Sequence, residues 1–484
     1  MTPPAFGAAE ARAVAPLAAV SFFAIVGLLR GTFARDDAAA PGLELGISFS
    51  GLAAGLLAVA LAWQPAGAAF GGTFALDGVA AFTDLVCTIA AGLTLLMARS
   101  HLRHVGVKAR EFAPLVLFSL AGMVVVAGAR DLIVLFLGVE MMSIPAYVLA
   151  GIQRREPRSG EAALKYFVLG AFAAAFLLYG IALLFGGTGA TSYDGIAAGL
   201  GRAPSLVLLG ATALLMVGLG FKIGIVPFHF WAPDVYQGAP TSVTAFLTVG
   251  IKAAAVAGAA RLFVEALGAA HVDWGIVLWW GAALTMTLGN VVAIAQSNVK
   301  RMLAYSSVAH AGYLLAALAA GTREAGGALL FYLLAYAFMN LGAFAVVIAV
   351  GARGEPNEQI RDYAGLGLRR PALAAAMAIC LLSLMGMPPL VGFAGKLYLV
   401  QAMVGVGYVG LAVLLMLNSV ASAFYYLRVI VAMFMREPAG EEAPPEPRPL
   451  LALSIALAVV GTVLLGIFPH LALDFARAAF LPGG

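Results

Sequence analysis

Four ionisable side chains lie within long apolar stretches of the sequence, where a charge is costly. They are Glu140, Lys222, Lys252 and Lys396, and Glu140 is the one carboxylate clearly central in such a stretch. A charge at the centre of a membrane helix costs about 3 kcal/mol on insertion scales, so four together approach the net stability of a typical domain. Such groups must pair, become hydrated or lose their charge, and burial favours the neutral form of both residue types. These residues therefore indicate proton transfer.

Two further residues are weaker candidates for the same chemistry. Lys165 lies close to the start of an apolar stretch, so its ammonium group could instead reach a nearby interface. His310 is the one histidine clearly inside a stretch, and it fits either a packed core histidine or a relay residue. Arg428 lies near the end of its stretch and is interpreted as a side chain that reaches the interface.

Polar side chains recur at helical spacing near these residues. Residues three or four positions apart share one face of a helix. Each set therefore forms a stripe that can hold a file of water molecules or join two helices. Four stripes alongside buried lysines favour a continuous hydrated path. The stripes are Thr244, Thr248 and Lys252; Ser306, His310 and Tyr313; Tyr332, Tyr336 and Asn340; and Asn418, Ser422 and Tyr425.

Prolines interrupt two of the apolar stretches beside a lysine. Pro227 follows Lys222, and two consecutive prolines at 388–389 precede Lys396. A proline inside a helix lacks an N–H and frees the carbonyl four residues earlier, and free backbone groups at membrane depth must line a cavity or contact protein. The two breaks could be related to each other, or they could be two unrelated proline kinks. The carbonyls expected to be free are those of Ile223, Leu384 and Met385.

The composition decides what surrounds these residues. The 484 residues are 62% hydrophobic and only 11% charged, with a mean hydropathy of +0.98, whereas a soluble domain is about a quarter charged. A helix needs about 20 apolar residues to cross the hydrocarbon core, and fourteen stretches approach or reach that length. The expected segments are 13–30, 43–63, 76–97, 112–129, 131–151, 162–186, 205–225 (continuing into a short segment near 228–238), 241–264, 274–296, 303–321, 326–350, 371–402, 406–433 and 449–471.

The loops between these segments differ strongly in basic residues. Loops that follow odd-numbered helices carry seventeen Lys or Arg, including Lys300, and loops that follow even-numbered helices carry four. Basic loops stay on the cytoplasmic side. Both termini are therefore expected on the non-cytoplasmic side. The four residues are Arg130, Arg202, Arg261 and Arg323.

The two breaks also divide the chain. They lie five helices apart, an odd number, so two five-helix units would be inverted relative to each other, as in many transporters. We predict an all-α membrane fold of about fourteen helices, with inverted repeats in helices 4–8 and 9–13 and breaks in helices 7 and 12. The predicted parts are three N-terminal helices in 1–111, a first repeat in 112–264, a second repeat in 274–433, and a C-terminal helix and tail in 434–484.

Motifs of nucleotide and redox chemistry are absent from the sequence. It contains no P-loop, no dinucleotide fingerprint and no haem ligand pair. Cys87 and Cys380 lie in apolar runs without a nearby His or Cys, which leaves disulfide, zinc and iron–sulfur sites unsupported. The net charge of +4 reflects basic loops and gives no support for a nucleic-acid partner. We expect no cofactor and no metal in this chain.

Four segments carry a family resemblance. They are GVEMMSIPAYVLAG at 138–151, GFKIGIVPFHFWAPDVYQGAPTSVTAFLTVGIKAAAVA at 220–257, NVKRMLAYSSVAHAGYLL at 298–315, and GMPPLVGFAGKLYLV at 386–400. The chain thereby resembles the antiporter-like membrane subunits of respiratory complex I, and among them the branch called subunit N in bacteria. The likeness covers the expected helices 4 to 13 and is weak in the first three.

The resemblance implies a role for each buried residue. Glu140 would be the glutamate of helix 5, Lys222 the lysine of helix 7, Lys252 the central connecting lysine and Lys396 the lysine on the exit side. Lys165 would match a lysine of helix 6.

The resemblance also implies a context. The chain would be a non-redox, proton-translocating subunit (a translocase) of NADH:quinone oxidoreductase in the bacterial cell (inner) membrane. NADH, FMN, iron–sulfur clusters and quinone would be bound elsewhere in the complex. Its partners would be the other membrane subunits, including antiporter-like paralogues, and the lipid bilayer.

Other functions remain open at this point. The chain could belong to a multisubunit cation/proton antiporter without redox coupling, or to a photosynthetic or ferredoxin-driven relative of complex I. A passive scaffold is least favoured, because it leaves the cost of the buried lysines unexplained.

Two single-cysteine variants test the predicted orientation. With Cys87 and Cys380 removed, Arg155→Cys lies in a basic loop and Ser192→Cys in a loop of the other class. An impermeant thiol reagent should therefore label them from opposite sides of oriented membrane vesicles. Labelling of both from the same side would contradict the predicted topology.

Overall fold

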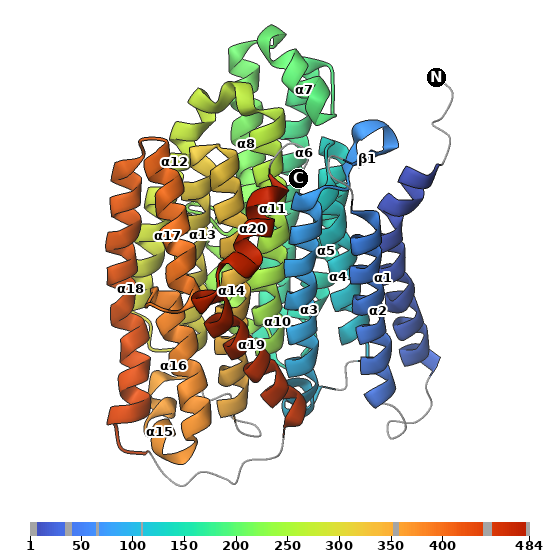
Figure 1. Ribbon diagram of the computed structural model, residues 1–484. Coiled ribbons are helices and arrows are strands. Elements are labelled where there is room, and N and C mark those ends of the chain that lie inside the picture. Colours follow the sequence, from blue (N-terminus) through green and yellow to red (C-terminus); the bar gives the residue numbers. More distant parts are fainter. Residues whose placement is uncertain are drawn as a thin grey trace.

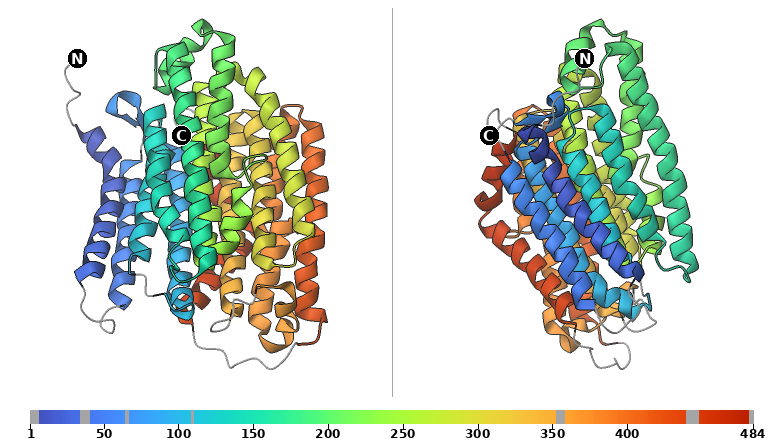
Figure 2. Two further views of the ribbon diagram at one scale, coloured as in Figure 1. Left: turned by 180° about the vertical axis from the view of Figure 1, so that it is seen from behind. Right: turned by 90° about the vertical axis from the view of Figure 1, so that its right-hand side faces the viewer.

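The fold is a bundle of helices that run alongside one another between two ends (Figure 1). Helices α1 and α2 stand at one edge and α18 at the opposite edge, and the view from behind agrees (Figure 2). The start of α1 and the end of α20 lie toward the same end of the bundle, which also carries α7 (Figure 1). The computed structural model describes residues 7–33, 41–63, 67–107, 110–351, 358–438 and 448–480.

The N-terminal part contains three long helices and one small hairpin. The two strands pair antiparallel, with Ala68 opposite Ala75. The elements are α1 (Ala8–Phe33), α2 (Pro41–Ala62), β1 (Ala68–Ala69), η1 (Phe70–Gly72), β2 (Phe74–Ala75) and α3 (Gly78–His104).

The next part contains the first broken helix and a helix with two π-helical turns. α8 stops at Ile223, and α9 resumes at Trp231, in the short segment that the sequence predicted. The π-helical turns η3 and η4 lie on either side of α11 in one continuous helical stretch, 241–266. The elements are α4 (Phe112–Gly128), α5 (Leu132–Ala150), α6 (Pro157–Thr188), α7 (Tyr193–Gly199), η2 (Leu200–Arg202), α8 (Ser205–Ile223), α9 (Trp231–Gly238), α10 (Thr241–Phe246), η3 (Leu247–Ile251), α11 (Lys252–Arg261), η4 (Leu262–Ala266) and η5 (Gly268–Ala270).

The last part contains the second broken helix and ends on the outside of the bundle. α19 and α20 run obliquely across α14 and α3 (Figure 1). The elements are α12 (His271–Ile294), α13 (Val299–Ala320), α14 (Arg323–Val350), η6 (Ile360–Tyr363), α15 (Leu366–Arg369), α16 (Pro371–Met385), α17 (Val391–Gly405), α18 (Val409–Met435), α19 (Pro449–Ile467) and α20 (His470–Ala479).

A helix lies at each of the fourteen segments that the sequence predicted, and the all-α membrane class is confirmed. Twelve helices of the described residues are long and apolar enough to cross a membrane, while α4, α16 and α17 are shorter. The number of crossings and the inverted relation of the repeats stay predictions. The hairpin, α7 and α20 were not predicted, because each is too short to give a long apolar stretch.

The centre of the bundle consists of the continuous stretch 241–266 together with α13 and α14. Their side chains are buried on nearly all sides, as expected for helices that are apolar all round. Small residues let the helices approach closely. A Cβ atom at Gly289 of α12 would lie 2.5 Å from the backbone nitrogen of Ala309 on α13, and one at Gly312 would lie 2.4 Å from that of Met286. Backbone contact therefore joins α12 and α13.

Both predicted helix breaks occur, and a glycine ends each helix. Gly224 (φ +81°) follows α8, and Gly386 (φ +95°) follows α16. In each case the next N–H reaches back to a carbonyl five residues earlier, at Gly220 or Leu382, which is a Schellman ending. The prolines that the sequence analysis made responsible lie two or three residues further on, where they cannot continue the helix.

Gly386→Ala tests this ending. Its Cβ would lie 3.0 Å from Cδ of Lys396, and a left-handed conformation costs an L-residue about 1–2 kcal/mol. We expect the unfolding temperature of the purified protein to fall, as measured by thermal denaturation. Gly405→Ala is the matched control, because its Cβ would meet no atom within 4 Å. Equal unfolding temperatures for the two variants would contradict this account.

Candidate functional site

Lys222 lies in the last turn of α8 within a cage of aromatic rings. Its Nζ donates a hydrogen bond of 2.8 Å to the hydroxyl of Tyr147 on α5. The ring centroids of Tyr147, Phe221 and Tyr166 lie 5.1, 5.6 and 5.8 Å from Nζ. Aromatic faces attract an ammonium group, so this buried site can accept a charged lysine without a carboxylate in contact.

Glu140 lies on α5, two turns before Tyr147, and is half-buried. Within the described part of the chain, its buried Oε1 atom has no hydrogen-bond partner. It is close enough to act electrostatically on both Lys222 and Tyr147, but it forms no ion pair with Lys222. The expected Glu140–Lys222 pair is therefore separated in this structure. Tyr147, which binds the lysine instead, was not among the predicted site residues.

Lys252 is buried at the centre of the bundle, directly after the π-helical turn η3. Its Nζ donates hydrogen bonds of 2.5 Å to the carbonyl and to the hydroxyl of Ser307 on α13. π-helical turns often mark functional positions in helices. Lys252 therefore joins the stretch 241–266 to α13 through one serine.

Lys396 lies on α17 and reaches across the break to the end of α16. Its Nζ donates hydrogen bonds to the carbonyls of Leu384 and Met385, at 2.9 and 2.8 Å, and to the hydroxyl of Ser419 on α18, at 2.7 Å. The sequence predicted that these two carbonyls would be free of helix partners. They bind the ammonium group of Lys396.

His310 lies on α13 between Lys252 and Lys396. Its Nδ1 is 2.7 Å from the hydroxyl of Tyr332, and its Nε2 is 3.3 Å from the hydroxyl of Tyr426. Two rings connect it to the lysines. The ring centroid of Tyr336 lies 5.0 Å from that of the imidazole and 5.9 Å from Nζ of Lys252. The ring centroid of Tyr313 lies 5.3 Å from that of the imidazole and 5.2 Å from Nζ of Lys396.

The polar stripes meet through hydrogen bonds between helices. Asn340 on α14 donates to the hydroxyl of Thr248 at 2.8 Å. Asn290 on α12 contacts the hydroxyls of Tyr313 and Tyr425, at 3.0 and 2.9 Å, and the amide oxygen of Asn418 at 3.2 Å. Asn290 was not among the predicted site residues, although Thr287 lies three residues before it at helical spacing.

Lys165 lies apart from the other candidates. Its ammonium group forms ion pairs with Glu161 at 2.6 Å and with Asp234 at 2.8 Å, and its side chain is 39% exposed. Arg301 on α13 binds the same Asp234 at 3.0 Å. Arg428, interpreted as an interfacial residue, donates to the carbonyls of Ile294 and Gln296.

Two basic residues assigned to loops are buried instead. Arg261 ends α11 with a fully buried side chain, which binds Asp77 at 2.6 Å and Glu265 at 2.9 Å. Lys300 is buried at the start of α13 and donates to the carbonyl of Ala239 at 2.6 Å. Lys300 was assigned to a loop because the predicted segment began at 303, whereas α13 begins at Val299. Arg261 was counted with the loops although it lies near the end of the predicted segment 241–264.

One buried carboxylate inside a helix was not predicted from the sequence. Asp84 lies inside α3 and is only 4% exposed, so Glu140 is not the one carboxylate within the predicted spans. The sequence does indicate this carboxylate, because Asp84 falls inside the predicted segment 76–97.

Comparisons with known proteins agree with this arrangement. A family model described as "NADH:quinone oxidoreductase/Mrp antiporter, TM" matches residues 129–424. The chain is 45% identical over 443 residues to NADH-quinone oxidoreductase subunit N of Trichlorobacter lovleyi, with 90% of each chain covered. It is 44% identical over 467 residues to subunit N of Chloroflexus aggregans, with 95% of each covered.

Solved structures share the fold. A chain of respiratory complex I from Thermus thermophilus with bound aureothin has a TM-score of 0.80 at 36% identity, with 97% of this chain and 100% of that chain covered. A chain of the Mrp complex from a Dietzia species has a TM-score of 0.81 at 24% identity, with 96% and 97% covered, which is a likeness of fold. This chain therefore belongs to the NADH:quinone oxidoreductase and Mrp antiporter family of transmembrane proteins, where it groups with subunit N.

Proposed function

We propose that this chain translocates protons as subunit N of a bacterial NADH:quinone oxidoreductase (complex I), through Glu140, Lys222, Lys252 and Lys396. One observation carries the proposal. His310 stands between two buried lysines, Lys252 and Lys396, and a tyrosine ring connects it to each of them. Among the described residues, neither lysine has a carboxylate in contact. If these lysines only held helices together as ion pairs, each would need a carboxylate partner.

The lysines in the proposed path can both hold and release a proton. Lys222 is at the C-terminus of α8, and Lys396 binds the C-terminal carbonyls of α16. The negative end of a helix stabilises a cation. The partners of these lysines are neutral groups, however. Deprotonation of the ammonium ion therefore loses less electrostatic interaction energy than it would beside a carboxylate.

His310 suits the step between the lysines. A neutral imidazole has one donor nitrogen and one acceptor nitrogen, and both nitrogens of His310 face a tyrosine hydroxyl. The ring can accept a proton on one side and donate one on the other. Ser307, the partner of Lys252, lies one helical turn before His310 on α13.

Glu140 begins the path in this proposal. When Glu140 approaches Lys222 the lysine keeps its proton, and when they separate, as in this structure, the Tyr147 hydroxyl is the contact that remains. α8 ends directly after Lys222, so its last turn can shift without moving an intact helix. We assign Lys165 to the ion cluster with Asp234 and Arg301, away from this path.

Two five-helix repeats, 112–264 and 274–433, would supply one half-channel each. The support is that each contains a half-helix that ends in a left-handed glycine, α8 or α16, beside a buried lysine. Inverted repeats with broken helices are common in transporters.

The redox chemistry would belong to partner subunits. NADH, FMN, iron–sulfur clusters and quinone would be bound there, and charge changes at their interface would reach this chain as a shift at Glu140. Among the described residues, no three His, Cys, Asp or Glu side chains form a metal-binding group. The chain would act in the bacterial inner membrane, with both termini outside the cytoplasm and with antiporter-like paralogues as neighbours.

Lys396→Ala tests the proposed path in the whole complex. The complex is purified through a tag on this chain, and its co-purifying chains are identified first. If the proposal is right, they include NADH-oxidising and quinone-reducing subunits. Proton pumping in vesicles should fall by at least about ten-fold, since a positioned proton-transfer group contributes about 10²–10⁴ in rate, and coupled electron transfer should fall with it.

Lys396→Arg separates proton transfer from charge. Arginine keeps the positive charge beside the carbonyls of Leu384 and Met385 but does not release a proton. It should therefore assemble and still fail to pump. Normal pumping by Lys396→Arg would make residue 396 a structural cation, and co-purification with antiporter subunits alone would overturn the redox context.

A double-mutant cycle tests the coupling of Glu140 and Lys222. Glu140→Gln and Lys222→Met should give strongly non-additive losses of pumping in complexes that assemble, because both residues would act on the same proton. Tyr147→Phe is the companion variant, since it removes the hydroxyl that Lys222 contacts while leaving both charges. Additive losses would indicate two independent sites. Failed assembly that is rescued in the double variant would indicate a static pair.

A further inference from the structure

Asp84 is a buried carboxylate outside the proposed path. It lies on α3, two turns after Asp77, and is 4% exposed. Within the described part of the chain, its buried Oδ1 atom has no hydrogen-bond partner. The hydroxyl of Thr83 beside it is likewise buried and without a partner there. An ionised carboxylate with an unpartnered oxygen in an apolar surrounding is costly, so the position favours a proton or a water molecule.

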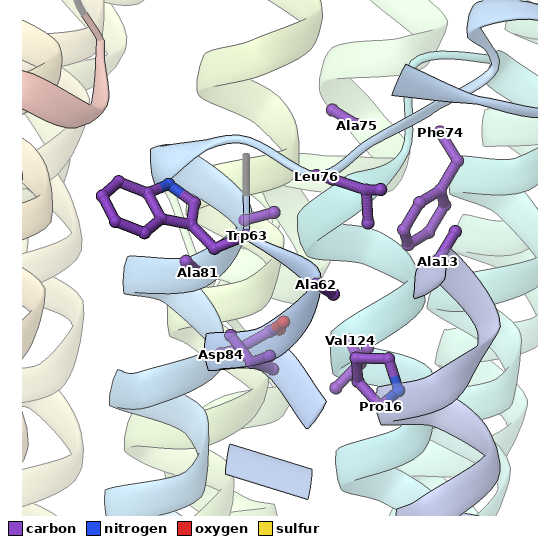
Figure 3. Close-up of a pocket in the computed structure, with 12 residues that line it drawn as sticks. Ala13, Pro16, Ala62, Trp63, Phe74, Ala75, Leu76, Ala81, Asp84 and Val124 are labelled. Carbon is purple, nitrogen blue, oxygen red and sulfur yellow. The ribbon is translucent and has the colours of Figure 1, made fainter. Parts of the chain in front are cut away.

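A cavity adjoins this carboxylate. It lies between α1, α2, α3 and α4, under the β1–β2 hairpin, and Asp84 points into it (Figure 3). Of the described residues that line it, most are apolar and Asp84 is the one that can ionise. Its volume, counted as the space open to the centres of water molecules, is about 20 Å³, which exceeds the 10–15 Å³ that one water needs.

The nearest cation is already paired. Arg261 acts electrostatically on Asp84, but its Nη atoms bind Asp77 and Glu265. Its Nε atom is buried and has no partner among the described residues. Two neighbouring helices thus hold an unmatched acceptor and an unmatched donor in the same region.

The other ionisable groups of the helices around the cavity do not act as partners of Asp84. Glu10 of α1 binds the backbone N–H groups of Gly7 and Phe70, and Arg12 is exposed. The one ionisable residue of α2 is Glu44, at its far end, and α4 contains none. On α3 itself, Cys87 donates to the carbonyl of Gly250 at 3.7 Å. Asp77 and Arg261 are therefore the charges that face Asp84.

We propose that Asp84 is a second proton-binding site, which exchanges its proton through this cavity with water at the end of the bundle that carries Asp77. The protonated acid matches the apolar lining. The ionised form adds a negative charge beside Arg261, whose free Nε–H can then donate to it. This proposal does not depend on the path through Glu140 and Lys396.

The location gives this site a route to the centre of the bundle. Arg261 ends α11 and Lys252 begins it, so the two lie nine residues apart, or about 13 Å along the helix. A charge that appears at Asp84 therefore acts on the same rigid element that carries the central lysine.

Cysteine accessibility tests the aqueous exchange. In the assembled complex with Cys87→Ala and Cys380→Ala, Asp84→Cys should react with an impermeant thiol reagent added from the Asp77 side. The control is Val86→Cys, at a fully buried position on another face of α3. We expect a rate at least about ten-fold higher at position 84, because thiol reactivity requires access. Ala62→Trp, which fills the cavity from α2, should abolish the difference. Equal rates at 84 and 86 would overturn the exchange.

Infrared spectroscopy of the intact complex tests proton binding directly. The C=O stretch of a protonated carboxylic acid should be lost in Asp84→Asn, return in Asp84→Glu and persist in Thr88→Val. The band should also shift in D₂O, because the site exchanges with water. A spectrum unchanged by Asp84→Asn would overturn proton binding, and a band that resists D₂O would overturn exchange. These measurements stand even where Asp84→Cys fails to assemble.

Discussion

A buried ammonium group needs oxygen atoms that lipid cannot supply, and the ends of interrupted helices supply them. The last carbonyls of a helix have no partner within it and carry partial negative charge. Lys396 uses two of these carbonyls, from α16, and Lys222 stands in the last turn of α8. Both helices must therefore stop inside the bundle, and their neighbours must enclose the gaps. The glycine endings, the aromatic cage and the close packing of small residues serve this one requirement.

The enclosure consists of rings, hydroxyls and carbonyls rather than carboxylates. A carboxylate in contact would hold each lysine in its charged form, because separating a buried ion pair leaves two uncompensated charges. Tyr147, Ser307 and Ser419 bind the ammonium groups without adding a charge. Carboxylates in contact with basic side chains occur instead near the ends of the helices, as in the ion pairs of Arg261 and Lys165. The centre can thus change its protonation state while the ends hold the helices together.

The sequence predicted the residue types of the site and the helices that carry them, because a lysine in an apolar stretch is conspicuous wherever the helix packs. It could not predict their partners, since these depend on which helices meet. The stripe of Thr244, Thr248 and Lys252 illustrates the difference. Its spacing assumes a regular α-helix, but η3 is a π-helical turn. The three residues consequently bond to three different elements: α9, α14 and α13.

The ends of the helices were also difficult to predict from the sequence. Arg261 lies three residues before the predicted end of its segment at 264, and this closeness to the boundary is why it was assigned to a loop rather than to the core. An apolar stretch indicates that lipid or protein surrounds the chain. At the end of such a stretch, the sequence pattern is the same for a buried, ion-paired arginine and for an arginine in a loop. Its burial depends on Asp77, which is 184 positions away in the sequence.

The separation between Arg261 and Asp77 has a consequence for biogenesis. The stretch 241–266 carries two basic residues, and each opposes insertion into the bilayer by about 3 kcal/mol. Synthesis proceeds from the N-terminus, so α3 with Asp77 is already in the membrane when this stretch leaves the ribosome, and Arg261 can pair at once. Lys252 must wait, because its partner Ser307 is 55 residues further on. During that interval the central lysine has not yet met its partner, and we therefore expect the nascent chain to depend on the insertion machinery to hold this helix until α13 arrives.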